Sequence, residues 1–149
     1  MKNIVGNLWN YAGDPKFILC ITVNGFVKKN GEAVMGRGCA LEAAQRYPQL
    51  PKELGAFIQK NGNVCSTNYY PETKQTILTF PVKHNWWEKA DLELIKRSTE
   101  TLRLAATSWL SDSIFILPKP GCKNGGLDWS EVEPIVSTLP DNVWCIDFK

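Results

Sequence analysis

The stretch FILCITV at Phe17–Val23 is an almost continuous run of apolar residues, interrupted only by Thr22. Runs of this kind are typical of strands that are buried on both faces, which occur in parallel or mixed sheets covered by helices. We therefore expect Phe17–Val23 to be a central strand of an α/β sheet.

The segments on either side of this strand alternate between strand and helix patterns. Further strands are predicted at Met1–Leu8, Val64–Tyr69, Gln75–Phe80, Ser113–Leu117 and Val143–Phe148, and helices at Cys39–Tyr47, from Pro51 to Asn61, from an N-cap at Asp91 to Leu110, and at Ser130–Leu139. This alternation predicts one α/β domain over residues 1–149, with helices on both faces of a mixed, mostly parallel sheet. Ligands of such sheets bind outside the carboxyl ends of the strands, so the loops that follow the strands should carry the function.

The composition excludes several classes of protein. Lys and Arg together number 17 against 15 Asp and Glu, a balance that argues against a protein that coats polyanions. No apolar run approaches the ~20 residues that span a bilayer, and no secretion signal is visible, so we expect a cytoplasmic protein without a membrane partner. Five widely spaced cysteines and one histidine fit neither a disulfide framework nor a zinc site, and we expect no metal and no cofactor.

The first unusual loop is Asn24–Gly38, NGFVKKNGEAVMGRG, which leads directly into a predicted helix. Gly36 and Gly38 flank Arg37 just before that helix, where glycines and the helix N-terminus together can bind an anion. The loop is not the dinucleotide fingerprint, because Leu41 stands where a third glycine is required. An ordinary glycine-rich turn is the alternative.

The second loop, Pro118–Trp129, reads PKPGCKNGGLDW and precedes another predicted helix. Gly121, Gly125 and Gly126 give it the backbone freedom of an anion-binding loop, although one of these glycines could serve only a turn. Two such loops at adjacent strand ends predict a ligand that is held from both sides, as a pyrophosphate would be.

The third loop, Pro81–Lys89, combines Lys83 with Trp86 and Trp87. A lysine held against apolar walls has a lowered pKa and becomes a nucleophilic amine, whereas a solvated loop lysine is the simpler alternative. Large aromatic residues in a loop suit ligand walls as well as core packing. His84 is the only histidine and could transfer protons near pH 7, or could simply cap the core or the surface.

The same segments resemble those of a known family. The matching pieces are GNL at Gly6–Leu8, TVNG at Thr22–Gly25, VMGRGCAL at Val34–Leu41, TFPVKHNWW at Thr79–Trp87 and PGCKNGGLDW at Pro120–Trp129. In their order and spacing they resemble the motifs of a macro domain over nearly the whole chain. Within that family they are most similar to one branch, which holds terminal ADP-ribose glycohydrolases, DNA ADP-ribosyl glycohydrolase antitoxins and small stand-alone phage and bacterial proteins. The resemblance implies a three-layer α/β/α fold that binds ADP-ribose.

The resemblance also implies roles for individual residues. Lys83 matches the lysine that attacks the anomeric carbon of the distal ribose, and we assign His84 to catalysis beside it. Asn7 falls at the position that reads adenine and Asn24 at the position near the distal ribose. The full set expected around ADP-ribose is Asn7, Leu8, Thr22, Asn24, Met35, Gly36, Arg37, Gly38, Cys39, Pro120, Gly121, Cys122, Lys123, Asn124, Gly125, Gly126 and Leu127.

The chain departs from the family pattern in two places. Protein-directed hydrolases of this branch pair the lysine with an aspartate in the second loop, but Asn124–Gly126 contains no carboxylate, and Asp128 is expected to lie in the first turn of the next helix. The insert Phe26–Val34 is the second difference and could shape which leaving group is accepted.

Three functions remain open from the sequence. The chain could be a hydrolase that removes ADP-ribose from protein or nucleic acid, a phosphatase of ADP-ribose 1″-phosphate, or a non-catalytic reader of ADP-ribose. Only Lys83, which a reader does not need, favours the hydrolase. We expect a monomer in each case.

Overall fold

The computed structural model describes residues 1–148 and contains a six-stranded sheet in the order β1-β6-β5-β2-β4-β3. The strands are β1 (Lys2–Gly6), β2 (Phe17–Asn24), β3 (Ser66–Tyr70), β4 (Gln75–Lys83), β5 (Ile114–Pro118) and β6 (Val143–Phe148). All neighbouring strands are parallel except β3 and β4, which are antiparallel. The mixed, mostly parallel sheet is therefore confirmed.

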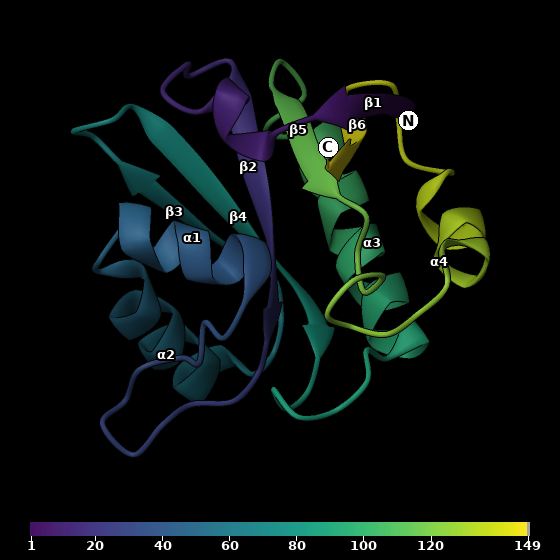
Figure 1. Cartoon of the computed structure of the whole chain (residues 1–149). Coiled ribbons are helices and arrows are strands. Elements are labelled where there is room, and N and C mark those ends of the chain that lie inside the picture. The colour runs from purple at the N-terminus through teal and green to yellow at the C-terminus, as the bar shows by residue number, and fades with distance from the viewer. Residues whose placement is uncertain (149) are drawn as a thin grey trace.

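Helices cover both faces of this sheet (Figure 1). The helices α1 (Gly38–Arg46) and α2 (Leu50–Asn61) lie on one face, and α3 (Leu92–Thr107) and α4 (Trp129–Val136) on the other. Strand β2 contributes to both cores, because Leu19 and Ile21 pack on the side of α1 and α2 while Ile18 and Cys20 pack on the side of α3 and α4. The apolar run at Phe17–Val23 is thus a strand buried on both faces, as predicted.

Several element boundaries follow from local signals. Asp91 caps α3 by accepting a hydrogen bond from the Glu93 amide at 2.9 Å, as expected of an N-cap. Asp128 and Glu131 form a capping box at the start of α4, which confirms Asp128 as an acid of that helix N-terminus. The strand predicted to reach Leu8 ends at Gly6, because Asn7 caps the 3-10 helix η1 (Leu8–Tyr11).

Strand β4 is longer than the sequence predicted. It was expected to end at Phe80, but it continues through Pro81 to Lys83. Proline lacks a backbone donor, yet the antiparallel pairing with β3 ends at Thr79, so Pro81 lies beyond that partner while β2 still runs alongside. Lys83 is therefore the last residue of a central strand and not a loop residue.

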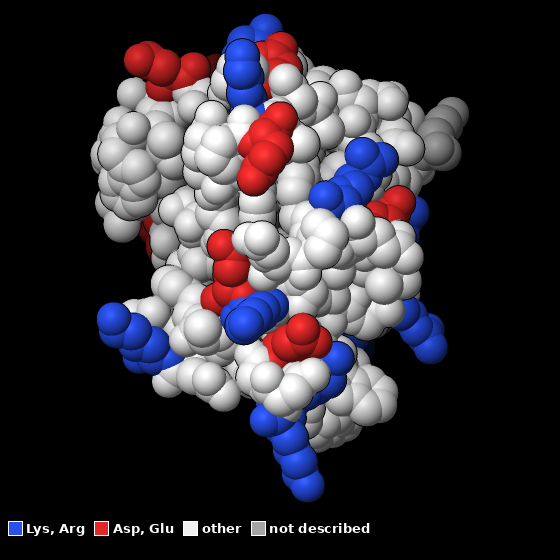
Figure 2. Space-filling view, turned by 90° about the vertical axis from the view of Figure 1, so that its left-hand side faces the viewer, with Lys and Arg blue, Asp and Glu red and all other residues white. Residues whose placement is uncertain are grey.

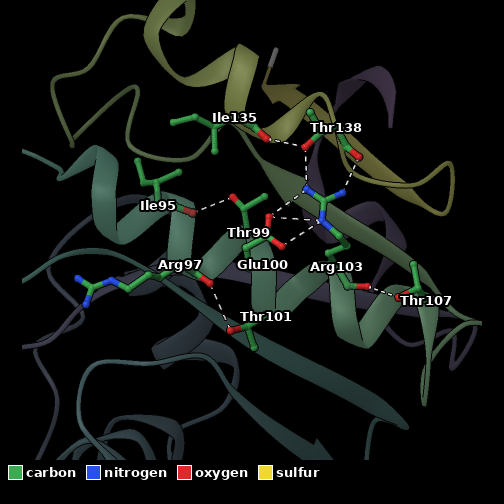
Figure 3. Close-up of polar contacts among 9 residues, drawn as sticks. All are labelled: Ile95, Arg97, Thr99, Glu100, Thr101, Arg103, Thr107, Ile135 and Thr138. Carbon is green, nitrogen blue, oxygen red and sulfur yellow. Dashed lines mark hydrogen bonds and ion pairs between the residues drawn. The ribbon is translucent and has the colours of Figure 1, made fainter.

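Arg103 joins α3 to the segment that follows α4, on the same face of the sheet (Figure 3). The guanidinium of Arg103 on α3 donates to the carbonyl oxygen and the hydroxyl of Thr138, at 2.6 and 2.7 Å, and also pairs with Glu100 at 3.2 Å. Thr138 in turn donates to the carbonyl of Ile135 on α4. These bonds hold α4, which begins directly after the second glycine-rich loop, against α3.

Charges of both signs are interspersed on the face that lies to the left in Figure 1, over β3, α1 and α2 (Figure 2). No continuous patch of one sign is visible among the described residues on that face, in keeping with the balanced composition. Within residues 1–148, none of the helices is both long and apolar enough to cross a membrane.

Candidate functional site

The three loops singled out in the sequence meet at the carboxyl ends of β2, β4 and β5. They line most of a cavity of about 1020 Å³, near the upper end of the size usual for small-ligand sites. The predicted residues that line it are Asn7, Thr22, Asn24, Gly36, Arg37, Gly38, Cys39, Lys83, Gly121, Cys122, Lys123, Asn124, Gly125 and Gly126. The predicted convergence of the loops is therefore confirmed.

The first wall is the N-terminus of α1. Gly38, its first residue, has a positive φ of 59°, and a Cβ atom there would lie 3.0 Å from Nδ2 of Asn124 on the opposite loop. Arg37 occupies the N-cap position without capping the helix through its side chain, and no acidic residue of the described chain stands in the first turn. The free backbone N–H groups of this turn are therefore available to an anion in the cavity.

The second wall is the glycine-rich loop after β5, which folds back on itself. The carbonyl of Gly121 accepts a hydrogen bond from the Leu127 amide at 2.9 Å, and that of Gly125 accepts from Ala90 at 2.8 Å. Gly121 has a φ of 75°, and a Cβ atom on Gly125 would collide with the backbone of Gly121. The close contact of these two glycines sets the shape of the loop.

Lys83 joins the strand to this loop. Its Nζ donates to the carbonyl oxygen of Asn124 at 2.9 Å and to that of Trp86 at 3.4 Å. Partial burial lowers the pKa of the Lys83 amine from its ordinary value, and the nearby Arg37 guanidinium lowers it further. The direction agrees with the sequence prediction, but the indole rings of Trp86 and Trp87 are more than half exposed and do not enclose the amine.

His84 points to a different part of the structure. Its Nε2 lies 2.7 Å from Oδ2 of Asp91 at the start of α3, and this hydrogen bond lowers the pKa of the Asp91 carboxyl. Within residues 1–148, His84 is not one of the residues that line the cavity. The structure therefore gives no geometric support to a catalytic role for His84.

The two predicted asparagines line the cavity and also hold the backbone around it. Asn7 accepts a hydrogen bond from the Trp9 amide at 2.9 Å. Asn24 donates to the carbonyl of Val34 at 3.0 Å and accepts from the amide of Phe26 at 2.9 Å, which closes the first loop. Direct contacts of Asn7 and Asn24 with a ligand stay predictions.

Some predicted residues lie elsewhere, and other lining residues were missed. Leu8, Met35, Pro120 and Leu127 are buried and, in the described chain, do not line the cavity, because their side chains fill the packing behind the loops. Trp86 and Trp87, which the sequence offered as ligand walls or core residues, line the cavity. The missed residues are Val23, Ala40, Glu42, Val82, Glu88, Lys89, Pro118, Lys119, Ile146, Asp147 and Phe148. The last three lie at the end of β6, and only the strand order, which places β6 beside β5, could have indicated them.

The charges around the cavity favour an anionic ligand. Lys119 is paired with Asp147 at 3.3 Å, and the ammonium of Lys123 lies 5.2 Å from the centre of the Phe148 ring. Basic side chains outnumber acidic ones, with Arg37, Lys83, Lys89, Lys119 and Lys123 against Glu42, Glu88 and Asp147. In the part of the chain that the structure describes, no group of His, Cys, Asp or Glu is placed to hold a metal ion.

The chain was compared with protein-family models, curated proteins and solved structures. No family model matches the chain. The DNA ADP-ribosyl glycohydrolase of Mycobacterium tuberculosis is 30% identical in an alignment of 121 residues that covers 75% of this chain and 34% of that protein. The macrodomain of Mycobacterium tuberculosis DarG superimposes over 98% of this chain and 97% of its own, with a TM-score of 0.76 and 25% identity. The chain is a macro domain similar to that of DarG.

A further structure supports the fold of this macro domain. Thermosipho africanus DarTG in complex with ADP-ribose matches all of the chain over 42% of its own length, with a TM-score of 0.77 and 19% identity. The expected three-layer α/β/α fold is thereby confirmed. The chain spans about a third of the length of the curated relatives that it matches, so their whole activity does not transfer directly.

Proposed function

We propose that this macro domain binds ADP-ribose in the cavity and hydrolyses the bond that joins ADP-ribose to modified DNA. The observation that carries the proposal is the position of Lys83, whose amine has a lowered pKa and lies between two loops suited to bind phosphate. The curated relatives are named DNA ADP-ribosyl glycohydrolases, and a similar structure is a complex with ADP-ribose.

The cavity suggests how ADP-ribose is held. Its pyrophosphate would lie between the free N–H groups of the first turn of α1 and the backbone of the loop Gly121–Gly126. A Cβ atom at Gly38 would lie 3.0 Å from Nδ2 of Asn124, so glycine at this position lets the backbone of the two walls approach the phosphates closely. The distal ribose would then lie beside Lys83, as the family resemblance implies.

The proposed reaction uses the neutral Lys83 amine as the nucleophile. Nζ forms a bond to C1″ of the distal ribose as the bond from C1″ to the leaving group breaks, and one amine proton passes to the leaving group. The second amine proton passes to the ring oxygen as the ribose opens, which leaves an imine. Water then adds to the imine carbon and releases ADP-ribose and the free amine.

The structure supports a role for the loop backbone where related hydrolases use an aspartate. Asn124–Gly126 contains no carboxylate, and Asp128 is engaged in the capping box of α4. The Asn124 carbonyl accepts the hydrogen bond from Lys83 instead. We therefore assign the acceptor that orients the amine to the Asn124 main chain, and we assign no step to His84.

Calorimetry with ADP-ribose and AMP tests the binding part of the proposal. We expect a low-micromolar or tighter Kd for ADP-ribose and much weaker binding of AMP, which lacks the second phosphate and the distal ribose. Absence of binding at about 1 mM ADP-ribose, a limit of ~4 kcal/mol, would contradict it. Parallel assays with ADP-ribosylated DNA, ADP-ribosylated protein and ADP-ribose 1″-phosphate then separate the hydrolase from the reader and the phosphatase.

The proposal includes two further expectations. All five cysteines carry free thiols, which supports a reducing compartment such as the cytoplasm. Binding of one ADP-ribose within one chain requires no second copy, so we expect a monomer, which light scattering would measure.

A further inference from the structure

Three aromatic side chains lie together at the mouth of the cavity, and the proposed reaction does not use them. The ring of Trp87 contacts Phe26 at a centroid distance of 5.5 Å and Trp86 at 5.4 Å, with interplanar angles of 68° and 88°. Trp86 and Trp87 both line the cavity, yet 53% and 59% of their surfaces are exposed. We call Phe26, Trp86 and Trp87 the aromatic cluster. Exposed apolar side chains that lie together in this way are typical of a binding surface.

The cluster is held in place by the insert Phe26–Val34. The Phe26 amide donates to Asn24, and its carbonyl accepts from the Val34 amide at 3.1 Å. The Ala33 amide donates to the carbonyl of Pro51 at 2.8 Å, and this hydrogen bond connects the insert to α2. Because Phe26 is fixed in this way, the aromatic cluster is organised before any ligand arrives.

The main chain of Trp86 also contacts the proposed nucleophile. The carbonyl of Trp86 accepts a hydrogen bond from Nζ of Lys83 at 3.4 Å. Attack requires C1″ to come within about 3–3.5 Å of Nζ, and the leaving group is bonded to that carbon. The group joined to ADP-ribose would therefore extend from Lys83 into the part of the cavity that Trp86 and Trp87 line.

We propose that the aromatic cluster stacks a nucleobase of single-stranded DNA at or next to the modified nucleotide. Every base offers a flat π-face that stacks on aromatic side chains, and in a duplex those faces are already covered by neighbouring bases. The basic Arg37 and Lys89, which line the same cavity, suit the adjoining phosphates. This inference rests on the proposed function and assigns the aromatic cluster as the part of the site that contacts a base of the DNA.

The test measures binding in a Lys83→Ala background, where substrate is not consumed, with a fluorescent ADP-ribosylated single-stranded oligonucleotide. Trp87→Ala and Trp87→Leu should weaken oligonucleotide binding by about 5- to 150-fold, the range of one lost base stack. Trp87→Phe, which keeps an aromatic face, should stay within about threefold of Trp87. All variants should bind free ADP-ribose as the parent does. Trp109→Ala is the matched control, because Trp109 is 65% exposed and is not among the lining residues of the described chain.

The outcomes separate this inference from the proposed function. Equal oligonucleotide affinity in the Trp87→Ala and parent proteins, with ADP-ribose binding intact, would overturn the inference and leave the proposed function standing. Retained oligonucleotide binding in Trp87→Leu would show an apolar contact without stacking and would also overturn it. A parent protein that binds no ADP-ribose would overturn the proposed function, and this inference with it.

Discussion

The Nζ atom of Lys83 lies 2.9 Å from the main-chain carbonyl oxygen of Asn124, 41 residues further along the chain. This bond connects the end of a rigid central strand to a loop whose shape depends on the contact between Gly121 and Gly125. The orientation of the amine is therefore tied to the conformation of the loop.

Gly125→Ala should impair the site through this connection. Its new methyl group would meet the backbone of Gly121, so the loop must shift and carry the Asn124 carbonyl with it. We expect a loss of about 1–3 kcal/mol of stability, the usual cost of overpacking, and a fall in turnover of at least about tenfold. Thermal denaturation and turnover of ADP-ribosylated DNA measure the two effects. Gly36→Ala is the control for stability, because a Cβ atom there meets open space.

Gly38→Val should abolish ADP-ribose binding in a protein that still folds. At a φ of 59° a β-branched side chain is strained by about 1–3 kcal/mol, and its Cβ atom would lie 3.0 Å from the Asn124 amide. The side chain would fill the space where we place the pyrophosphate. Calorimetry measures the affinity, with Gly13→Val as a control for strain alone, since Gly13 also has a positive φ but meets open space. An unchanged Kd in folded Gly38→Val would show that the loop only connects elements.

Much of the fold could be predicted from local sequence patterns. The buried run in β2, the N-cap at Asp91 and the capping acid Asp128 are short-range signals, and each is confirmed. The extension of β4 through Pro81 could not be predicted, because a proline within a strand is tolerated only where the neighbouring strand has ended. That condition depends on where β3 stops in three dimensions.

The glycine-rich loops of the site could be predicted from the sequence. The lining residues on β6 could not, because they depend on the order of the strands in the sheet. The glycines around Gly38 and Gly121 have unusual backbone conformations, and these signals are visible in the sequence. Asp147 and Phe148 reach the cavity only because β6 lies beside β5. Met35, which was expected around ADP-ribose, has its side chain buried in the core.

The rate of hydrolysis should rise with pH. In the proposed reaction the neutral form of Lys83 attacks, and its pKa is lowered from the ordinary 10.5, so the rise in kcat should have its midpoint below pH 10.5. Arg37→Gln removes one cause of the lowered pKa and should move the midpoint to higher pH. Lys89→Gln removes another cation of the same cavity and is the control. An unchanged midpoint in Arg37→Gln would contradict the electrostatic coupling of Arg37 to Lys83.

His84→Ala should retain turnover within about threefold, because the imidazole ring of His84 is hydrogen-bonded to Asp91 outside the cavity. The variant should instead raise the pKa of Asp91, since the hydrogen bond from His84 lowers it. A lowered carboxyl pKa stabilises the fold at neutral pH, and this contribution disappears as the pH falls through that pKa. The stability difference between the two proteins should therefore shrink in acid. A loss of turnover of a hundredfold or more would return His84 to the catalytic site.

Substitution of Lys83 should separate chemistry from binding. Lys83→Ala should lose hydrolysis while its Kd for ADP-ribose stays within about tenfold, or ~1.4 kcal/mol, because the amine acts in the transition state and the phosphate loops bind the ground state. Lys83→Arg should also be inactive, since a guanidinium stays protonated. Wild-type turnover by Lys83→Ala would remove the amine from the reaction.

Borohydride trapping during turnover tests the central claim most directly. The reagent reduces the imine to a stable secondary amine, and mass spectrometry of the digested protein locates it. We predict an adduct of the opened ADP-ribose on the peptide that contains Lys83, formed from ADP-ribosylated DNA and absent in Lys83→Ala. Active hydrolysis of that DNA with no adduct on Lys83, or with the adduct on another lysine, would contradict the proposed role of this amine.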